Sequence, residues 1–252
     1  MEFESNYNIL YIISQRDMDD TTTLEALSIF LIDRGFSAKL IQRSSSKTPD
    51  LCANDGENTY LFELKMRHDS KEPSLFRTDP MVRLNTISGL VSDATKQLKS
   101  MGSEDTIRML WFLGQPPNEK TFYEQLRMTL YGIRVVVGLR NGRSIPAECY
   151  YAGYSDFYRY RDVLDGAILG TVAAIFINDF SLHADLLKNS RLSKLAGSAV
   201  LDPRDIEKSD DFFVLRDSVD RSNEKSVLQC LEKNHCIQNA KFERMVKFSI
   251  TD

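Results

Sequence analysis

The sequence predicts a mixed α/β protein, and three observations lead to this expectation. Segments with apolar residues at helical spacing alternate along the chain with short, β-prone apolar runs. Two of these runs flank a turn-forming stretch, Asn54 to Asn58, whose Asp-Gly dipeptide is a strong hairpin signal. A hydrophobic content of 42% with 27% charged residues is that of a globular domain with a packed core.

The first half of the chain is expected to run helix, three strands, helix, strand. The first helix has four apolar residues on one side and ends before Gly35, a favourable helix terminator. Asp79-Pro80 is a start signal for the second helix. The expected elements are a helix from Asp20 to Arg34, strands at Phe36 to Gln42, Thr48 to Ala53 and Thr59 to Lys65, a helix from Met81 to Met101, and a strand from Arg108 to Leu113.

The second half continues the alternation of helices and strands. A strand is expected at Ile133 to Leu139 that could close the same sheet, and the loop-like stretch from Asn141 to Pro146 suggests a boundary. We therefore expect a core of residues 1–143 and a C-terminal α/β extension of residues 144–252, for binding a partner or the substrate. Further helices are expected at Thr121 to Tyr131, Leu182 to Leu195 and Asn223 to Lys233, and further strands at Glu148 to Tyr154, Ala173 to Ile177, Phe212 to Arg216 and Phe242 to Ile250.

The hairpin around the Asp-Gly turn brings charged residues to one face. Residues two apart in a strand share a face, so Glu63 and Lys65 project together. A two-residue turn places Asp50 diagonal to Glu63, and a four-residue loop places it directly opposite. A slip by one residue moves Asp50 to the other face of the sheet. Both favourable registers therefore gather two carboxylates and one ammonium group.

Two carboxylates this close repel each other unless a cation lies between them. Oxygen ligands suit Mg²⁺ or Mn²⁺ better than Zn²⁺. A lysine beside such a metal can position an attacking water or a phosphate oxygen. This combination indicates metal-assisted hydrolysis of a phosphodiester.

The same residues resemble the signature of a known family. Pro49-Asp50, twelve intervening residues and Glu63-Leu64-Lys65 are similar to the motif of the PD-(D/E)XK nuclease superfamily. The resemblance implies a restriction-endonuclease-like core, with a central mixed β-sheet flanked by helices. It implies Mg²⁺ or Mn²⁺ as the cofactor and nucleic acid, DNA in the first place, as the substrate.

The resemblance also implies a role for each motif residue. Asp50 and Glu63 would hold the metal, and Lys65 would position the nucleophilic water. Glu25, in the first helix, matches a further acidic ligand, and Gln97, in the second helix, matches a catalytic glutamine. Two alternatives stay open: Thr22-x-x-Glu25 is also a capping box, and Gln97 could be an ordinary helix contact.

Composition limits the partners and the compartment. A net charge of −4 argues against a broadly basic surface that grips nucleic acid anywhere, so we expect a homodimer or a partner-protein complex. The tyrosine-rich stretch from Tyr150 to Arg161 is a candidate surface for bases or for a protein. Four cysteines without metal-site spacing, and an acidic, polar start at Met1 to Asn8, indicate a cytoplasmic protein. Two other functions remain open, RNA cleavage and non-catalytic binding on the same fold.

Overall fold

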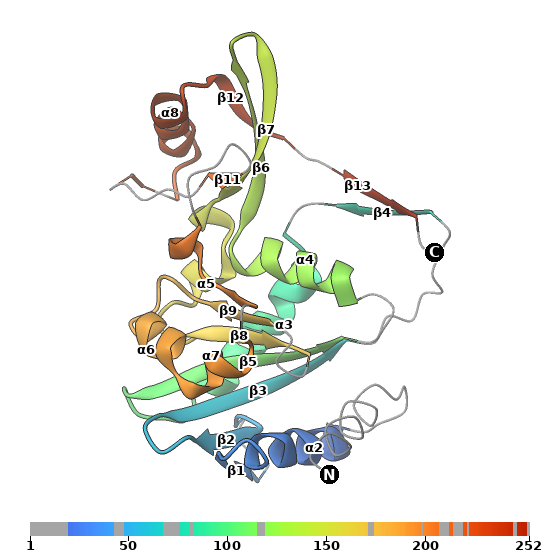
Figure 1. Cartoon of the computed structure of the whole chain (residues 1–252), viewed down its shortest axis with the longest axis vertical. Coiled ribbons are helices and arrows are strands. Elements are labelled where there is room, and N and C mark those ends of the chain that lie inside the picture. The colour runs from blue at the N-terminus through green and yellow to red at the C-terminus, as the bar shows by residue number, and fades with distance from the viewer. Residues whose placement is uncertain are drawn as a thin grey trace. The chain divides into compact units, whose positions relative to one another are not determined.

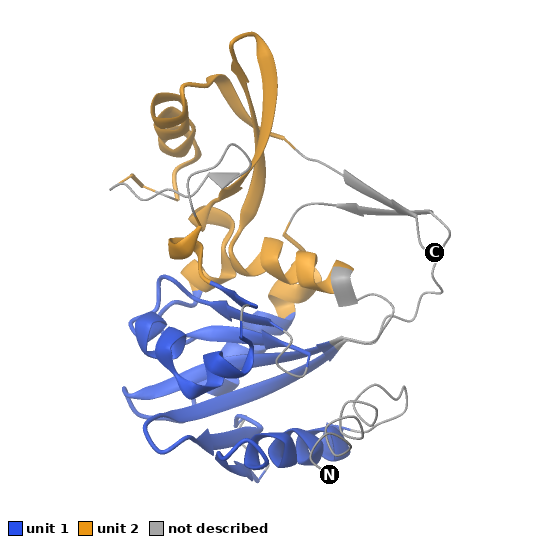
Figure 2. Cartoon of the chain, in the orientation of Figure 1, with its two compact units in different colours: residues 1–69, 90–119, 160–201 blue, residues 70–89, 120–159, 202–252 orange. Residues whose placement is uncertain are grey.

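A computed structural model describes most of the chain, in two compact units (Figures 1 and 2). Unit 1 comprises residues 1–69, 90–119 and 160–201, and unit 2 comprises residues 70–89, 120–159 and 202–252. The expectation about Met1 to Asn8 falls outside the described residues, which are 20–42, 48–67, 76–80, 83–114, 119–170, 174–197, 199–206, 212–213, 219–220, 222–243 and 246–250.

Unit 1 is built on a seven-stranded mixed sheet with the order β1-β2-β3-β5-β8-β9-β10. β1, β2 and β3 form an antiparallel meander, and β3, β5 and β8 run parallel to one another. The expected fold class, a central mixed sheet with helices, is therefore confirmed. The strands are β1 (Ser37–Leu40), β2 (Leu51–Asn54), β3 (Thr59–Arg67), β5 (Thr106–Gly114), β8 (Gly166–Leu169), β9 (Ala174–Ile177) and β10 (Val200–Leu201).

Helices lie on both faces of this sheet. α2 (Asp20–Ile32), α6 (Ala184–Asn189) and α7 (Arg191–Leu195) contribute to one apolar cluster with Tyr60, Phe62 and Leu64 of β3. Because side chains alternate along a strand, Glu63 and Lys65 point to the opposite face. α3 (Asn85–Leu98) lies over that face, where the side chain of its Gln97 reaches Glu63.

The β2–β3 loop fixes the register of the hairpin. Asn54 pairs with Thr59, so residues 55–58 form a four-residue loop. The Asp55 carboxylate accepts hydrogen bonds from the main chain of Glu57 and Asn58, at 3.0 and 2.7 Å, and from the Tyr60 hydroxyl at 2.5 Å. Gly56 has φ +97°, a conformation that favours glycine. The turn predicted from the sequence is therefore held by its own side chains.

Unit 2 contains a four-stranded sheet with the order β11-β7-β6-β12. α8 packs on this sheet, and its Val227 and Leu231 share an apolar cluster with Val136 and Cys149. β4 and β13 form a separate two-stranded sheet. The elements are β4 (Phe76–Pro80), α4 (Glu119–Leu130), β6 (Ile133–Arg140), β7 (Arg143–Tyr150), η1 (Ala152–Tyr154), α5 (Asp156–Arg159), η2 (Pro203–Asp205), β11 (Phe212–Phe213), α8 (Glu224–His235), β12 (Gln238–Glu243) and β13 (Val246–Ile250).

Several elements differ from the sequence expectations. β6 does not close the large sheet, because it pairs with β7 and β12 instead. The division expected at residue 143 does not coincide with the compact units: Arg143 begins β7, and the large sheet takes β8, β9 and β10 from later residues. α3 begins at Asn85, after Asp79 and Pro80, which lie in β4. The helix expected at Leu182 to Leu195 is broken at Ser190, whose hydroxyl caps α7.

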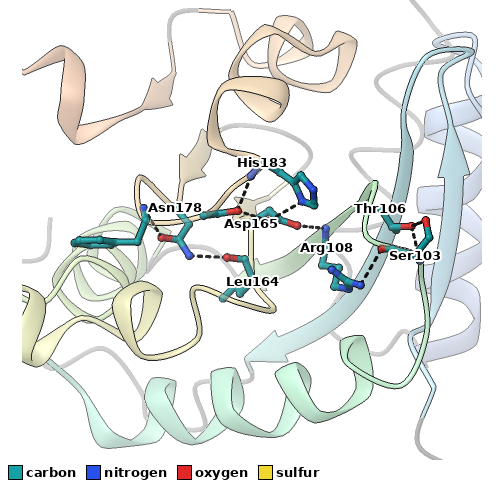
Figure 3. Close-up of polar contacts among 9 residues, drawn as sticks. Ser103, Thr106, Arg108, Leu164, Asp165, Asn178 and His183 are labelled. Atoms are coloured by element: carbon teal, nitrogen blue, oxygen red, sulfur yellow. Dashed lines mark hydrogen bonds and ion pairs between the residues drawn. The ribbon is translucent and has the colours of Figure 1, made fainter.

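A buried carboxylate ties together three chain segments of unit 1 (Figure 3). Asp165, only 4% exposed, precedes β8 and accepts a hydrogen bond from the main-chain N–H of Arg108 at 2.7 Å. Its other oxygen accepts from the Ser181 hydroxyl and lies 3.2 Å from Nδ1 of His183. We call these side chains, Asp165, Ser181 and His183, the Asp165 cluster. The cluster fixes the turn that leads from β9 to α6.

Asp55→Ala is expected to destabilise the protein by about 1–2 kcal/mol, because it removes three hydrogen bonds from the loop that sets the hairpin register. Urea unfolding of the full chain measures this effect. Glu57→Ala, an exposed change in the same loop, serves as the control and should stay within about 0.5 kcal/mol of the wild type. Equal unfolding midpoints for the two variants would show that Asp55 does not hold the loop.

His183 is expected to stabilise the protein in a pH-dependent manner. The hydrogen bond to Asp165 raises the pKa of His183, against the opposing effects of burial and of the Arg108 charge. This stabilisation is fully present below the ordinary histidine pKa of about 6.5 and is lost as the pH rises through the raised value. The stability difference between the wild type and His183→Ala should therefore shrink between pH 6 and pH 8.5. A difference that does not change over this range contradicts the assignment.

Candidate active site

Asp50 lies immediately before β2, at the end of the paired part of the hairpin. The pairs run from Asn54 with Thr59 to Leu51 with Phe62. The main-chain N–H of Asp50 donates to the carbonyl of Phe62 at 3.0 Å. The Asp50 carboxylate in turn accepts the N–H of Leu64 at 2.9 Å. This is the four-residue-loop register, one of the two that bring the carboxylates to one face.

Glu63 lies at the centre of a buried polar cluster. Its side chain is 2% exposed, and its Oε1 lies 2.6 Å from Nζ of Lys65. The same oxygen accepts a hydrogen bond from the side-chain amide of Gln97 on α3. Gln97 also donates to the main-chain carbonyl of Thr48 at 3.4 Å. The sequence-predicted residues Asp50, Glu63, Lys65 and Gln97 are thus brought together.

The electrostatics of the cluster disfavour a charged Glu63. Burial raises the pKa of Glu63 to about 7, and the nearby Asp50 carboxylate adds to the rise. The Lys65 ammonium acts in the opposite direction and only partly offsets it. A second cation between the two carboxylates would restore the ionised form at neutral pH.

The donor set fits a hard divalent cation. Oε2 of Glu63 is buried and accepts no hydrogen bond from a donor group, whereas Oε1 is held by Lys65 and Gln97, and the Asp50 carboxyl group lies close to Glu63. Leaving such an oxygen without a partner costs about 1–3 kcal/mol, more when it is charged. Mg²⁺ is commonly held by one or two carboxylates, with water and substrate phosphate completing its shell. Within the described ranges no group of three or more Asp, Glu, His or Cys residues could hold a metal, so the fit is to this pair.

Glu25 is not brought to this cluster. It is exposed on α2, and the neighbouring Leu24 and Leu27 pack with Phe62 on the sheet face opposite Glu63. The capping-box alternative does not match the helix start either, because Thr22 already lies inside α2. The helical spacing identified the buried side of α2 correctly.

Several basic residues of the described chain are engaged in ion pairs. Arg83 is engaged by the buried Asp156 at 2.9 Å, and Arg134 pairs with Glu224 at 2.8 Å. Lys96 on α3 and Lys99, directly after the end of α3, are exposed, and Lys96 pairs with Asp93. His68 and Lys71 lie outside the described residues. Lys96 and Lys99 are therefore the candidates for contact with phosphates.

The carbonyl of Thr48 is a part of the site that sequence reasoning missed. It accepts from Gln97 and so helps to aim the amide at Glu63. Every residue has a main-chain carbonyl, so the residue types alone cannot show which carbonyl belongs to a site. Only the bend of the chain before β2 brings this one to α3.

Comparison with known proteins adds one distant match. No family model matches the chain, and no curated protein matches it. A search of solved structures finds the 1.6 Å structure of Hjc, a Holliday junction resolvase from the archaeal hyperthermophile Archaeoglobus fulgidus. The match has 18% identity and a TM-score of 0.24, and it covers 38% of this chain and 69% of that chain. A TM-score this low supports no functional argument, so the assignment of function depends on the cluster itself.

Glu63→Gln is expected to stabilise the metal-free protein at neutral and alkaline pH. In the wild type, folded Glu63 keeps its proton up to about pH 7, whereas the unfolded chain loses it near the ordinary glutamate pKa. Wild-type stability should therefore fall as pH rises between these values, and glutamine removes this dependence while still accepting hydrogen bonds. Thermal unfolding in chelator at pH 4.5 and pH 8 measures the effect. A variant that loses stability relative to wild type at pH 8 would contradict the assignment.

Proposed function

We propose that this protein is a metal-dependent nuclease that hydrolyses DNA phosphodiester bonds at the Asp50–Glu63 pair. The observation that carries the proposal is the buried, unpartnered oxygen of Glu63 beside Asp50, with Lys65 on the other carboxylate oxygen. An ion pair with a purely structural role is not stabilised by a second carboxylate or by a buried oxygen that accepts no hydrogen bond. A site that must take up Mg²⁺ or Mn²⁺ needs both.

Each residue has a role that follows from its contacts. Asp50 and Glu63 would hold the cation, which supplies Lewis-acid polarisation of the phosphate and a more acidic water when bound. Lys65 is 18% exposed, so its ammonium can reach solvent and orient a water or a phosphate oxygen. Gln97 holds Oε1 of Glu63, and Oε2 would be available to the cation.

The negative net charge of the chain affects how strongly it can bind a nucleic-acid substrate. With a net charge of −4, the chain should bind DNA weakly by itself, and affinity gained from phosphate contacts falls with salt. A homodimer or a partner protein would supply the missing contacts. Among the helices of the described part of the chain, none is long and apolar enough to span a membrane.

Asp50→Asn and Glu63→Gln are each expected to lower DNA cleavage by about two orders of magnitude or more, because each removes one of two metal ligands. Lys65→Met should slow turnover by roughly 10²- to 10⁴-fold while affecting metal binding less. Cleavage of plasmid and linear DNA in Mg²⁺, Mn²⁺ and chelator measures activity. A shift of the unfolding temperature on adding Mg²⁺ measures metal binding independently, and it should vanish in Asp50→Asn.

Glu57→Gln is the matched control, since it neutralises an exposed carboxylate in the same hairpin. It should cleave DNA and respond to Mg²⁺ like the wild type. Metal binding without cleavage of any nucleic acid would favour a non-catalytic binding protein. Cleavage of RNA and not of DNA would favour the alternative substrate. Wild-type activity in all three site variants would exclude this cluster as the active site.

A further inference from the structure

The hairpin formed by β6 and β7 ends in a tight turn that projects from unit 2. The strands pair without a break from Ile133 with Tyr150 to Arg140 with Arg143. Residues 141 and 142, Asn-Gly, have φ angles of +52° and +74°, as in the turns that close two-residue hairpins. A side chain added at position 142 would meet no atom within 4 Å, and Figure 1 shows the turn extending beyond α8 and β12. We call residues 139–144 the ribbon tip.

The arginines of this hairpin are unevenly explained by the fold. From Ile133 to Ala147 the hairpin holds three arginines and no acidic residue. Arg134, near the start of β6, pairs with Glu224 at 2.8 Å. Arg140 and Arg143, at the ribbon tip, lie directly opposite each other. Like charges in this position destabilise a sheet, so folding alone does not account for both of them.

The two arginines of the ribbon tip have different surroundings. Arg140 donates to the main-chain carbonyl of His235 at 2.8 and 3.2 Å. His235 is the last residue of α8, and the carboxyl end of a helix favours a cation. Arg143 is exposed and forms no ion pair with a described residue. The charge of Arg140 therefore contributes to the packing of unit 2, whereas the charge of Arg143 is accessible to a ligand.

The elements beside the ribbon tip do not cancel its charge. Lys233 is exposed in the last turn of α8. The acidic residues between positions 230 and 243 are both engaged: Glu232 accepts the N–H of Ala240 at 2.9 Å, and Glu243 lies 2.5 Å from Nζ of Lys241. Together with the two arginines, this surface has a positive charge in a chain whose net charge is −4.

We propose that the ribbon tip binds duplex DNA, with Arg143 contacting a phosphate and the turn entering the major groove. The major groove of B-DNA is about 12 Å wide and admits a two-stranded β-ribbon. The turn is preorganised by its backbone geometry, which lowers the entropy cost of binding. The inference rests on the proposed function, because it takes DNA as the ligand, and it adds contacts that the chain itself makes with that substrate.

Other ligands fit the ribbon tip less well. Duplex RNA has a deep, narrow major groove that side chains cannot read. Single strands are bound through aromatic side chains that stack on the bases, and residues 139–144 include none. Leu139, 38% exposed, is the one large apolar residue of the ribbon tip, whereas the centre of a protein interface is usually apolar.

The test measures binding of the full-length chain to a fluorescein-labelled DNA duplex, by fluorescence anisotropy in chelator over a range of salt concentrations. The wild type should bind with a dissociation constant of roughly 1–100 µM. Arg143→Glu should weaken binding about tenfold or more and reduce the dependence of log affinity on log salt by about one, because one phosphate contact is lost. Lys225→Glu is the matched control, since it reverses an exposed charge at the other end of α8, and it should stay within about twofold of the wild type.

Arg143→Glu should not lower the stability of the protein. Its new carboxylate faces Arg140 across the two strands, so a repulsive pair becomes an attractive one. The unfolding temperature should equal or slightly exceed that of the wild type. A weaker affinity for DNA in a protein that is at least as stable separates loss of binding from misfolding.

Four results would overturn the proposal: no DNA binding by the wild type, unchanged binding in Arg143→Glu, an equal loss in Lys225→Glu, or tighter binding of duplex RNA. A loss in Leu139→Ala without a loss in Arg143→Glu would also overturn it, and would assign the tip to a protein partner. The nuclease proposal is judged separately, by cleavage in metal. Arg143-dependent binding without cleavage would remove that proposal alone, and cleavage with unchanged binding in Arg143→Glu would remove this one alone.

Discussion

The register of the β2–β3 hairpin is the constraint on which the candidate site depends. A shift of the strand pairing by one residue moves every side chain of the shifted strand to the opposite face of the sheet. One step away from the observed pairing of Leu51 with Phe62, β2 would turn its buried Leu51 and Ala53 out of the apolar cluster beneath α2 and α7. The four-residue loop excludes that pairing locally, through the carboxylate of Asp55 and the backbone freedom of Gly56. The chemistry of the site is therefore set by a turn whose residues take no part in it.

The second constraint is electrostatic. A buried carboxylate with a raised pKa is costly for a fold, and an apolar residue at position 63 would pack on α3 without that cost. The polar atoms around Glu63 come from three separate segments, the turn before β2, the strand β3 and the helix α3. Ordered polar contacts from several elements around one destabilised group are typical of sites where binding of a ligand supplies the missing stabilisation.

The features that could be predicted from the sequence are those that depend on residues close together in the chain. The hairpin, the buried side of α2 and the strand β5 follow from turn chemistry and from periodicity. The partners of β6 could not be read, because an apolar run does not specify which sheet it joins. β8, with the sequence Gly-Ala-Ile-Leu, is too short and too uniformly buried to alternate, and it was missed. Glu25 illustrates the same limit, since helical spacing does not show which face of a sheet a helix covers. The roles of Asp50, Glu63, Lys65 and Gln97 stay predictions.

The interleaving of the two units has a consequence for biosynthesis. The parallel neighbours β5 and β8 are separated in sequence by residues 115–165, most of which belong to unit 2. The large sheet is complete only after β10, which ends at Leu201. At ribosomal rates of 5–20 residues per second, roughly 3–11 s pass between the synthesis of Gly114, the last residue of β5, and that of Leu169, the last residue of its partner β8. During this interval β5 has an unpaired edge in the nascent chain, and such edges favour aggregation. A chaperone that shields this edge during translation would be of more use to this protein than to one whose sheet forms in the order of its sequence.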